Sequence, residues 1–295
     1  MFQNILFQDN LTKPVSVTVL REDLNHPLYQ GNKFWKLKNN LFDAIQNGHD
    51  TLLTFGGACS NHIYATAVAG SLNHLKTIGV IRGQEPAIYS STLQFAREHG
   101  MRLHFVTREE YRRKEESGFI ARLKNLFGDF HLIPEGGSNE AGLRGCVEWG
   151  DSLVSHADIF CLAAGTATTA AGIAQALLSR DPGAKVIAFS ALKDGGFLKT
   201  QAEKMAGSPL PNLSMITDYH FGGYAKYTPE LLAFITQIEK DYSLPLEHVY
   251  TGKTLYGILD LSRKSYFPGD KRICFIHTGG LQGKLHSKDH KELNR

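Results

Sequence analysis

Short apolar runs rich in β-branched residues alternate along the chain with longer segments of helical period. The first pattern is typical of buried strands and the second of amphipathic helices. Strands that alternate with helices in this way favour an α/β architecture of open, twisted, mostly parallel sheets. The predicted strands are Val15–Leu20, Thr51–Phe55, Lys76–Ile81, Arg102–Val106, Asp158–Ala163, Lys185–Ser190 and Arg272–His277, and the predicted helices are Lys33–Gln46, Asn61–Leu72, Ser90–Glu98, Glu109–Leu126, Glu140–Val154, Thr168–Leu178 and Pro229–Lys240.

Composition narrows the class of protein. The 295 residues are 42% hydrophobic, which suffices for a sizeable core, and two domains are the better expectation at this length. A net charge of +3 from 32 basic and 29 acidic residues predicts no nucleic-acid stripe. Four cysteines without a C-x-x-C pair favour reduced thiols, and scattered histidines predict no metal site. We see no signal peptide or membrane span and expect a cytoplasmic protein.

Four glycine-rich turns follow predicted strands, at Gly56–His62, Gly136–Asn139, Gly165–Gly172 and His277–Gly280. Ligands of open α/β sheets bind beyond the carboxyl ends of the strands, where helix N-termini present unpaired N–H groups. Without a Walker lysine or a G-x-G-x-x-G with a downstream acid, a phosphate monoester fits better than a nucleotide. Taken alone, the third turn is better explained as a helix start packed closely on its strand.

Lys33 follows Gly31-Asn32, where Asn32 is a candidate N-cap. The positive end of the helix dipole disfavours an ammonium there and helps a lysine that must be neutral to attack an aldehyde. Most lysines near helix starts are solvated, so this position alone proves little. The neighbouring Phe34 and Trp35 indicate partial burial.

Ser60, Asn61 and His62 end the first turn and begin a helix. Their side chains and N–H groups could bind a carboxylate and a cofactor's phenolic oxygen, or Ser60 or Asn61 could be only an N-cap. A Ser-His hydrolase is disfavoured, because no G-x-S-x-G elbow exists and His62 would point away from Ser60. Cys59 is a weaker candidate nucleophile still.

Taken together, these motifs resemble the fold-type-II enzymes of the D-cysteine desulfhydrase and 1-aminocyclopropane-1-carboxylate (ACC) deaminase family, which use pyridoxal 5′-phosphate. The resemblance spans nearly the whole chain in order, which makes it more specific than any single motif. The segments that carry it are Leu20–Asp23, Gly31–Lys33, Gly56–His62, Pro134–Asn139, Gly165–Gly172, Val249–Lys253 and His277–Gly280.

The resemblance implies a tryptophan synthase β-like fold with pyridoxal phosphate in the cleft between two domains. The large cofactor-binding domain would combine residues 1–35 with 146–295, and the small domain would be 36–145. It also implies a small amino-acid substrate and a homodimer, with neither nucleic acid nor membrane as partner.

The resemblance also implies a role for each matching residue. Lys33 would hold the cofactor as a Schiff base, and Ser60, Tyr250 and Tyr224 would join it in catalysis. Asn61 would bind the phenolic oxygen, Thr251 would face the pyridine nitrogen, and Thr278 would also bind the cofactor. The phosphate cradle would be Gly165, Thr166, Ala167, Thr168 and Thr169, and the substrate-binding residues would be Ser60, Asn61, His62 and Tyr250.

Some positions depart from the family's pattern. Trp35 stands where the family usually has arginine, and the loop Gly165–Thr169 replaces the usual Gly-Ser-Gly-Gly-Thr. ACC deaminases are expected to carry Glu and Leu where this chain has Thr251 and Thr278. With a neutral threonine instead of a carboxylate at the pyridine nitrogen, the cofactor ring is a weaker electron sink. A weaker sink suits the elimination of a good leaving group such as thiolate. We therefore predict a D-cysteine desulfhydrase that yields pyruvate, sulfide and ammonia.

Three alternatives stay open. One is ACC deamination, which yields 2-oxobutyrate and ammonia. Another is a fold-type-II sulfhydrylase or dehydratase acting on L-amino acids, disfavoured because those enzymes share a Ser-Gly-Asn loop where this chain has Cys59-Ser60-Asn61. The third is a non-catalytic protein that binds pyridoxal phosphate. The retained Ser60, His62 and tyrosines argue against it.

Overall fold

The computed structural model describes residues 1–8 and 14–284, which divide into two compact units. The six-stranded unit consists of Met1–Asn32 together with the chain from Cys146 onward, and the four-stranded unit is Lys33–Gly145. Each unit contains one sheet. The predicted α/β class with mostly parallel sheets is confirmed.

In the six-stranded unit the strand order is β1-β2-β10-β7-β8-β9. The N-terminal strand β1 runs antiparallel to β2, and the other neighbouring strands are parallel. The strands are β1 (Phe2–Phe7), β2 (Val15–Arg21), β7 (Ile159–Ala164), β8 (Lys185–Ser190), β9 (Leu213–Ile216) and β10 (Ile273–His277). The helices are α7 (Thr168–Arg180), α8 (Phe197–Ala206), α9 (Pro229–Tyr242) and α10 (Thr251–Arg263), with short 3-10 turns at Glu22–Leu24 and Leu281–Gly283.

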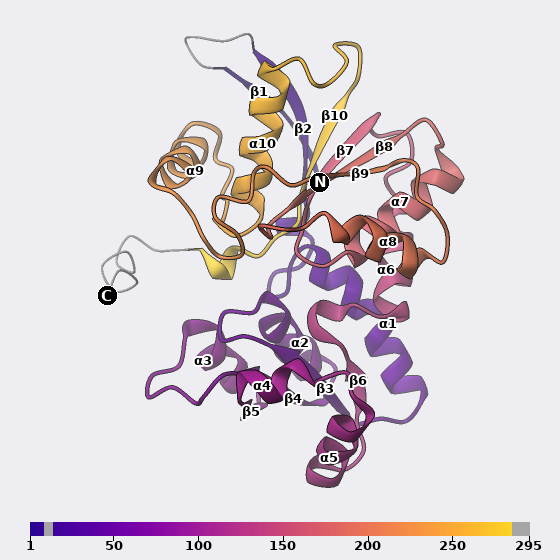
Figure 1. Cartoon of the computed structure of the whole chain (residues 1–295), viewed down its shortest axis with the longest axis vertical. Helices are drawn as coiled ribbons and strands as arrows, with labels where there is room; N and C mark the ends of the chain where they lie inside the picture. Colours follow the sequence, from indigo (N-terminus) through magenta and orange to yellow (C-terminus); the bar gives the residue numbers. More distant parts are fainter. Residues whose placement is uncertain (9–13, 285–295) are drawn as a thin grey trace. The chain divides into compact units, whose positions relative to one another are not determined.

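Helices cover both faces of this sheet (Figure 1). On one face, Ile235 of α9 and Ile258 of α10 share a core with strand residues such as Phe275. On the other face, α7 packs against β7, β8 and β9 and against α8. Strand β7 is buried along its whole length. Its continuous apolar sequence is what a parallel strand covered on both sides requires.

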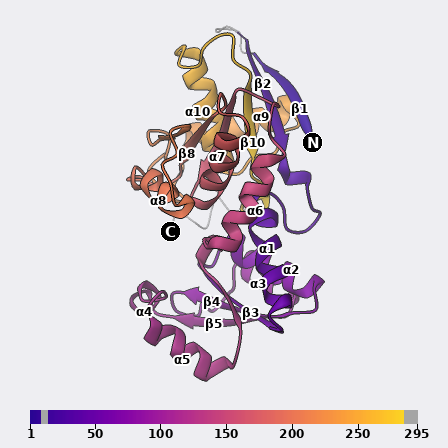
Figure 2. The same ribbon diagram turned by 90° about the vertical axis from the view of Figure 1, so that its right-hand side faces the viewer.

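The sheet of the four-stranded unit has the order β5-β4-β3-β6, and all of its pairs are parallel. Helix α5 lies on one face of this sheet and α2 on the other (Figure 2). Phe55 of β3 packs with Phe119 of α5, and Ile81 of β4 packs with Ile63 of α2. The strands are β3 (Thr51–Gly56), β4 (Lys76–Arg82), β5 (Met101–Val106) and β6 (His131–Ile133). The helices are α1 (Asn32–Gln46), α2 (Asn61–Leu72), α3 (Ser91–Glu98), α4 (Arg108–Arg112), α5 (Ser117–Phe127) and α6 (Glu140–Asp151), with a 3-10 turn at Glu135–Gly137; α1 begins and α6 ends in the six-stranded unit.

The predicted helix Glu109–Leu126 is wrong as a single element, because the chain forms α4 and α5 instead. Thr107 and Glu110 form a capping box that starts the first helix, and Arg113 ends it. The Arg113 side chain then bonds to Glu116, the N-cap residue of α5. The pattern also missed β1, β6 and β9, which are edge strands, and the helices α8 and α10.

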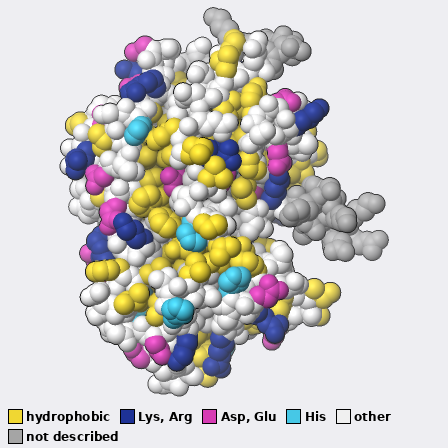
Figure 3. Space-filling model, turned by 180° about the vertical axis from the view of Figure 1, so that it is seen from behind, with side chains coloured by type: hydrophobic (Ala, Val, Ile, Leu, Met, Phe, Trp, Pro, Cys, Tyr) yellow, Lys and Arg dark blue, Asp and Glu magenta, His cyan; other side chains and the backbone are white. Residues whose placement is uncertain are grey.

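Some further features bear on the class of protein. All four cysteines are free, and Cys59 alone among them is exposed. Within the described residues, no helix is both long and apolar enough to cross a membrane. On the face drawn in Figure 3, basic side chains are dispersed among acidic ones.

Candidate active site

The turn between β7 and α7 is suited to an anion. It joins Ala164, the last residue of β7, to Thr168, the first of α7. The N-cap residue Ala167 makes no side-chain cap to the first backbone N–H groups of the helix. Uncapped N–H groups at a helix N-terminus attract anions such as phosphate. None of the residues 165–169 has a positive φ, so alanine and threonine replace the family's glycines without backbone strain.

Gly165 is needed for close approach rather than for its conformation. A Cβ atom there would lie 2.7 Å from Cε1 and 2.9 Å from the hydroxyl oxygen of Tyr250. The ring of Tyr224 meets that of Tyr250 edge-on, with 6.1 Å between centroids. The two predicted tyrosines and the predicted phosphate turn are therefore neighbours in the six-stranded unit.

The residue before Lys33 is bound to the same turn. Asn32 donates from Nδ2 to Thr169 Oγ1 at 3.1 Å, and its backbone N–H donates to the Thr278 carbonyl at 3.3 Å. Gly31 makes this approach possible, because its φ is +68° and a Cβ atom there would lie 1.8 Å from the Thr278 oxygen. Asn32, the residue before Lys33, is thus hydrogen-bonded to two predicted cofactor-binding segments.

Thr251 is fully buried, and its hydroxyl is engaged by Glu247. Thr251 Oγ1 lies 3.0 Å from Glu247 Oε1 and accepts the Glu247 backbone N–H at 3.0 Å. The carboxylate also accepts the backbone N–H groups of Val249 (2.6 Å), Tyr250 (2.9 Å) and Thr251 (2.6 Å). Burial raises the pKa of Glu247, and these donors act against that rise.

Sequence reasoning did not single out Glu247. The available signal was an acidic residue shortly before the start of a helix, where a carboxylate can bind the first N–H groups. Glu247 fixes the backbone of Tyr250 and Thr251 and orients the Thr251 hydroxyl toward itself.

A buried network supports Thr278. His277 Nε2 lies 2.7 Å from the Pro245 carbonyl oxygen, and its Nδ1 lies 3.3 Å from Asp23. Arg21 donates two hydrogen bonds to the Asp23 carboxylate, at 2.8 and 2.7 Å. Burial lowers the pKa of His277, and Asp23 partly opposes this. The network ties the turn after β10 to the segment that leads into Glu247.

In the four-stranded unit, β3 and β6 are parallel neighbours, so the turns that follow them emerge at the same edge of the sheet. Ser60 is the N-cap of α2, and its hydroxyl oxygen accepts the N–H groups of His62 (3.2 Å) and Ile63 (3.3 Å). The N-cap interpretation of Ser60 is therefore correct. Its hydroxyl hydrogen is not used in these two bonds. Asn61 is the first residue of the helix.

Lys33 lies beside a second lysine that sequence reasoning missed. The ammonium groups of Lys33 and Lys36 both donate to the Gly136 carbonyl, at 3.4 and 3.2 Å, and Lys36 is fully buried. The pKa of the buried His62 ring is well below its usual value, first through burial and then through Lys33 and Lys36. The two side chains thus place two cationic groups at one carbonyl oxygen. A lysine in this setting is suited to nucleophilic attack.

The predicted residues thus form two groups, one in each unit. The first group offers a helix N-terminus without a side-chain N-cap, and the second offers an amine in cationic surroundings. These are the two features by which a protein holds a phosphate-bearing aldehyde such as pyridoxal phosphate, so the residues present fit that cofactor. The first group is Gly165–Thr169, Tyr224, Tyr250, Thr251 and Thr278, and the second is Lys33, Ser60, Asn61 and His62.

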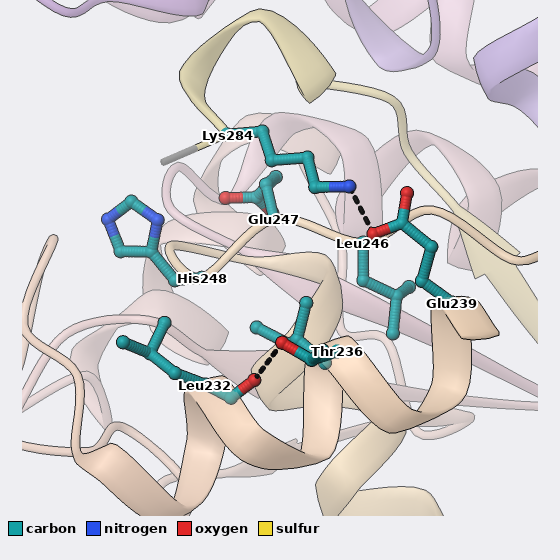
Figure 4. A pocket seen from close by; sticks show the side chains of 8 residues that line it. Leu232, Thr236, Glu239, Leu246, Glu247, His248 and Lys284 are labelled. Carbon is teal, nitrogen blue, oxygen red and sulfur yellow. Dashed lines mark hydrogen bonds and ion pairs between the residues drawn. The ribbon is translucent and has the colours of Figure 1, made fainter. Parts of the chain in front are cut away.

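A separate small cavity lies between α9 and the segment Leu246–His248 (Figure 4). Lys284 and Glu239 form an ion pair on its wall. Its volume of about 60 Å³ is far below the roughly 300 Å³ at which small-molecule sites begin. Among the residues that the structure describes, no group of three or more His, Cys, Asp or Glu side chains is placed to hold a metal ion.

Comparison with known proteins identifies the family. The family model described as "Pyridoxal-phosphate dependent enzyme" matches residues 5–279. The chain is 29% identical to the "Bifunctional D-cysteine desulfhydrase/1-aminocyclopropane-1-carboxylate deaminase, mitochondrial" of Arabidopsis thaliana, covering 90% of this chain and 72% of the relative. It is 25% identical to the "D-cysteine desulfhydrase" of Yersinia pestis, covering 90% and 86%.

A solved structure described as "the ACC deaminase homologue" superimposes with a TM-score of 0.79 at 29% identity, covering 93% of this chain and 87% of that one. The chain therefore belongs to the family of pyridoxal-phosphate dependent enzymes, within the fold-type-II group of ACC deaminases and D-cysteine desulfhydrases.

Proposed function

We propose that this enzyme eliminates sulfide from D-cysteine. Each D-cysteine would consume one water and yield pyruvate, hydrogen sulfide and ammonia. The Cβ–S bond breaks with loss of the Cα proton, and water then replaces the amino group. The observation that carries the proposal is the neutral, fully buried threonine at position 251.

When bound, pyridoxal phosphate supplies an aldehyde that condenses with amines and a conjugated ring that withdraws electrons from the substrate's Cα. Lys33 Nζ would be the attachment point and, once released, the base that accepts the Cα proton. The N–H groups of the α7 N-terminus would bind the phosphate, and the residues Ser60–His62 would bind the substrate carboxylate. The remaining role of the protein is to orient these groups and tune their charges.

The setting of Thr251 supports the choice of reaction. Its hydroxyl lies within hydrogen-bond reach of Glu247, whose charge is already shared among three backbone N–H groups. A carboxylate committed in this way stabilises a protonated pyridine nitrogen less than a carboxylate in direct contact would. A weaker electron sink favours departure of thiolate over cleavage of a carbon–carbon bond.

A direct assay tests this proposal. The purified enzyme should release pyruvate from D-cysteine faster than pyruvate from L-cysteine or 2-oxobutyrate from ACC. Faster release of 2-oxobutyrate would instead assign the deaminase activity, and preference for L-cysteine would assign the sulfhydrylase or dehydratase class. Binding of the cofactor without turnover of any of these would favour a non-catalytic carrier.

Lys33→Ala provides the second test. The parent should show a yellow absorbance that borohydride bleaches, and Lys33→Ala should lose it, because no amine remains to bond the aldehyde. Lys36→Ala is the matched control, because Lys36 donates to the same Gly136 carbonyl as Lys33. This variant should keep the borohydride-sensitive band. A reducible band that persists in Lys33→Ala would mean that another lysine holds the cofactor.

ACC deamination is the second candidate, favoured by the names of the Arabidopsis relative and of the solved homologue. The two activities differ in the product that the assay detects. The homodimer and the cytoplasmic location expected from the sequence remain predictions, as does a cofactor site between the two domains.

A further inference from the structure

The segment that carries Tyr224 consists of two consecutive tight turns. The Gly223 N–H donates to the His220 carbonyl at 3.0 Å, and the Lys226 N–H donates to the Gly223 carbonyl at 3.1 Å. This loop, residues 220–226, lies in the connection between β9 and α9, and its Tyr224 is 48% exposed. The loop backbone therefore helps to set the position of Tyr224.

The loop backbone is strained. Phe221 and Ala225 have φ of 50° and 55°, and Gly222 and Gly223 between them have φ of 93° and 114°. Left-handed conformations are unfavourable for residues that carry a Cβ atom. Such conformations persist only where the surrounding structure holds them.

Lys253 supplies such a hold. Its ammonium group donates to the His220 carbonyl and to the Gly223 carbonyl, both at 2.8 Å, so one cation bridges both turns. Lys253 is 2% exposed and sits in the first turn of α10, where the helix dipole disfavours a cation. Burial lowers the pKa of Lys253 to about 8, and Glu247 acts to raise it. The side chain is thus mainly an ammonium at neutral pH.

We propose that Lys253 is a positioning residue whose ammonium holds the loop 220–226 in its strained conformation and thereby keeps Tyr224 against Tyr250. The effect on the loop stands on its own geometry. Its consequence for catalysis rests on the proposed function, which places both tyrosines at the substrate.

Hydrogen exchange of the backbone amides at pH 7 tests the clamp without any assay of activity. In Lys253→Met, amides of residues 220–226 should exchange about tenfold faster than in the parent, because two charge-assisted hydrogen bonds are lost. Lys253→Arg, which keeps the charge and the donors, should restore most of the protection. Lys226→Met is the matched control, since Lys226 lies on the same loop with an exposed side chain.

Kinetics form the second arm. If both proposals hold, Lys253→Met should lower kcat/KM for the elimination about tenfold while the borohydride-sensitive absorbance of Lys33 remains. Faster loop exchange in an enzyme that eliminates sulfide at the parental rate would support the clamp and contradict its proposed consequence for catalysis. Unchanged exchange in a folded Lys253→Met, or a uniform increase through both units, would overturn the clamp.

Methionine in place of a buried lysine can unfold a chain. An independent measurement is therefore made on the parent enzyme, which carries no substitution. With ¹⁵N-labelled lysine, the Lys253 ammonium should give a slowly exchanging ¹⁵N–H signal at pH 7 that disappears in Lys253→Arg and remains in Lys226→Met. Absence of such a signal would contradict the contact.

Discussion

At the scale of single residues, the proposed chemistry depends on charged neighbours of the predicted site residues. Thr251 lies beside a buried carboxylate, and Lys33 shares a carbonyl with a buried ammonium. In both cases the partner changes the electrostatics of the predicted residue without being a candidate to touch the substrate. Electrostatic effects of this kind are strong because burial keeps water from screening them.

The reaction preference should respond to substitution at this level. Thr251→Glu combined with Thr278→Leu places a carboxylate at the proposed pyridine position. Glu247→Gln should accompany them, because the new carboxylate would lie close to the existing one. The triple variant should shift the ratio of ACC to D-cysteine turnover at least tenfold, which corresponds to about 1.4 kcal/mol of differential barrier.

The ratio is measured as the release of each keto acid, and two control variants accompany the triple variant. Glu247→Gln alone shows what the loss of the buried charge does, and Thr251→Ser keeps a hydroxyl and should preserve the ratio. An unchanged ratio in a folded triple variant that binds the cofactor would remove Thr251 from the explanation of specificity.

At the scale of elements, the site is built where strands end and helices begin. The turn after β7, the turn after β10 and the start of α1 are joined by the bonds that Asn32 makes to Thr169 and Thr278. This join needs a glycine at position 31, since no side chain fits against the Thr278 carbonyl.

Gly31→Ala tests this join, with Gly48→Ala as its control. Both glycines have a left-handed φ, +68° and +73°, but a Cβ atom at Gly48 would contact nothing within 4 Å. Gly48→Ala should lower the free energy of unfolding by about 1 kcal/mol, the cost of the backbone conformation alone. Gly31→Ala should lower it by about 3 kcal/mol or more, because backbone atoms must also move.

Urea unfolding and cofactor titration measure the two variants. Gly31→Ala should also weaken the binding of pyridoxal phosphate, whereas Gly48→Ala should not. Equal losses of stability in both variants would show that the segment before Lys33 is free to move away from Thr278.

At the scale of the whole molecule, the two groups of predicted residues belong to different compact units. The sequence analysis predicts that one cofactor contacts both groups, and this prediction can be tested. Addition of pyridoxal phosphate to the cofactor-free enzyme should protect backbone amides of residues 165–169 in one unit and of 56–62 in the other. The readout is hydrogen exchange with peptide mapping, and borohydride reduction should place the cofactor on the peptide that contains Lys33. Protection confined to one unit would contradict a site between domains.

Local patterns in the sequence determined much of this architecture. Alternating apolar runs and helical periods located most strands and helices, because both signals depend only on neighbouring residues. Lys33 was found at a helix start and Ser60 at an N-cap for the same local reason. The single long helix predicted at Glu109–Leu126 failed where a capping box, also a local signal, was overlooked.

Only the tertiary structure decided which partners surround the predicted residues. Glu247 acts through a helix N-terminus that the pattern did not predict, and Lys36 reaches a carbonyl about a hundred residues further along the chain. Lys253 holds a loop that lies some thirty residues earlier in the chain. Periodicity carries no information on such distant pairs. The physical reason is that burial and electrostatic coupling arise when the chain folds, so a residue's charge state is set by neighbours that are remote in sequence.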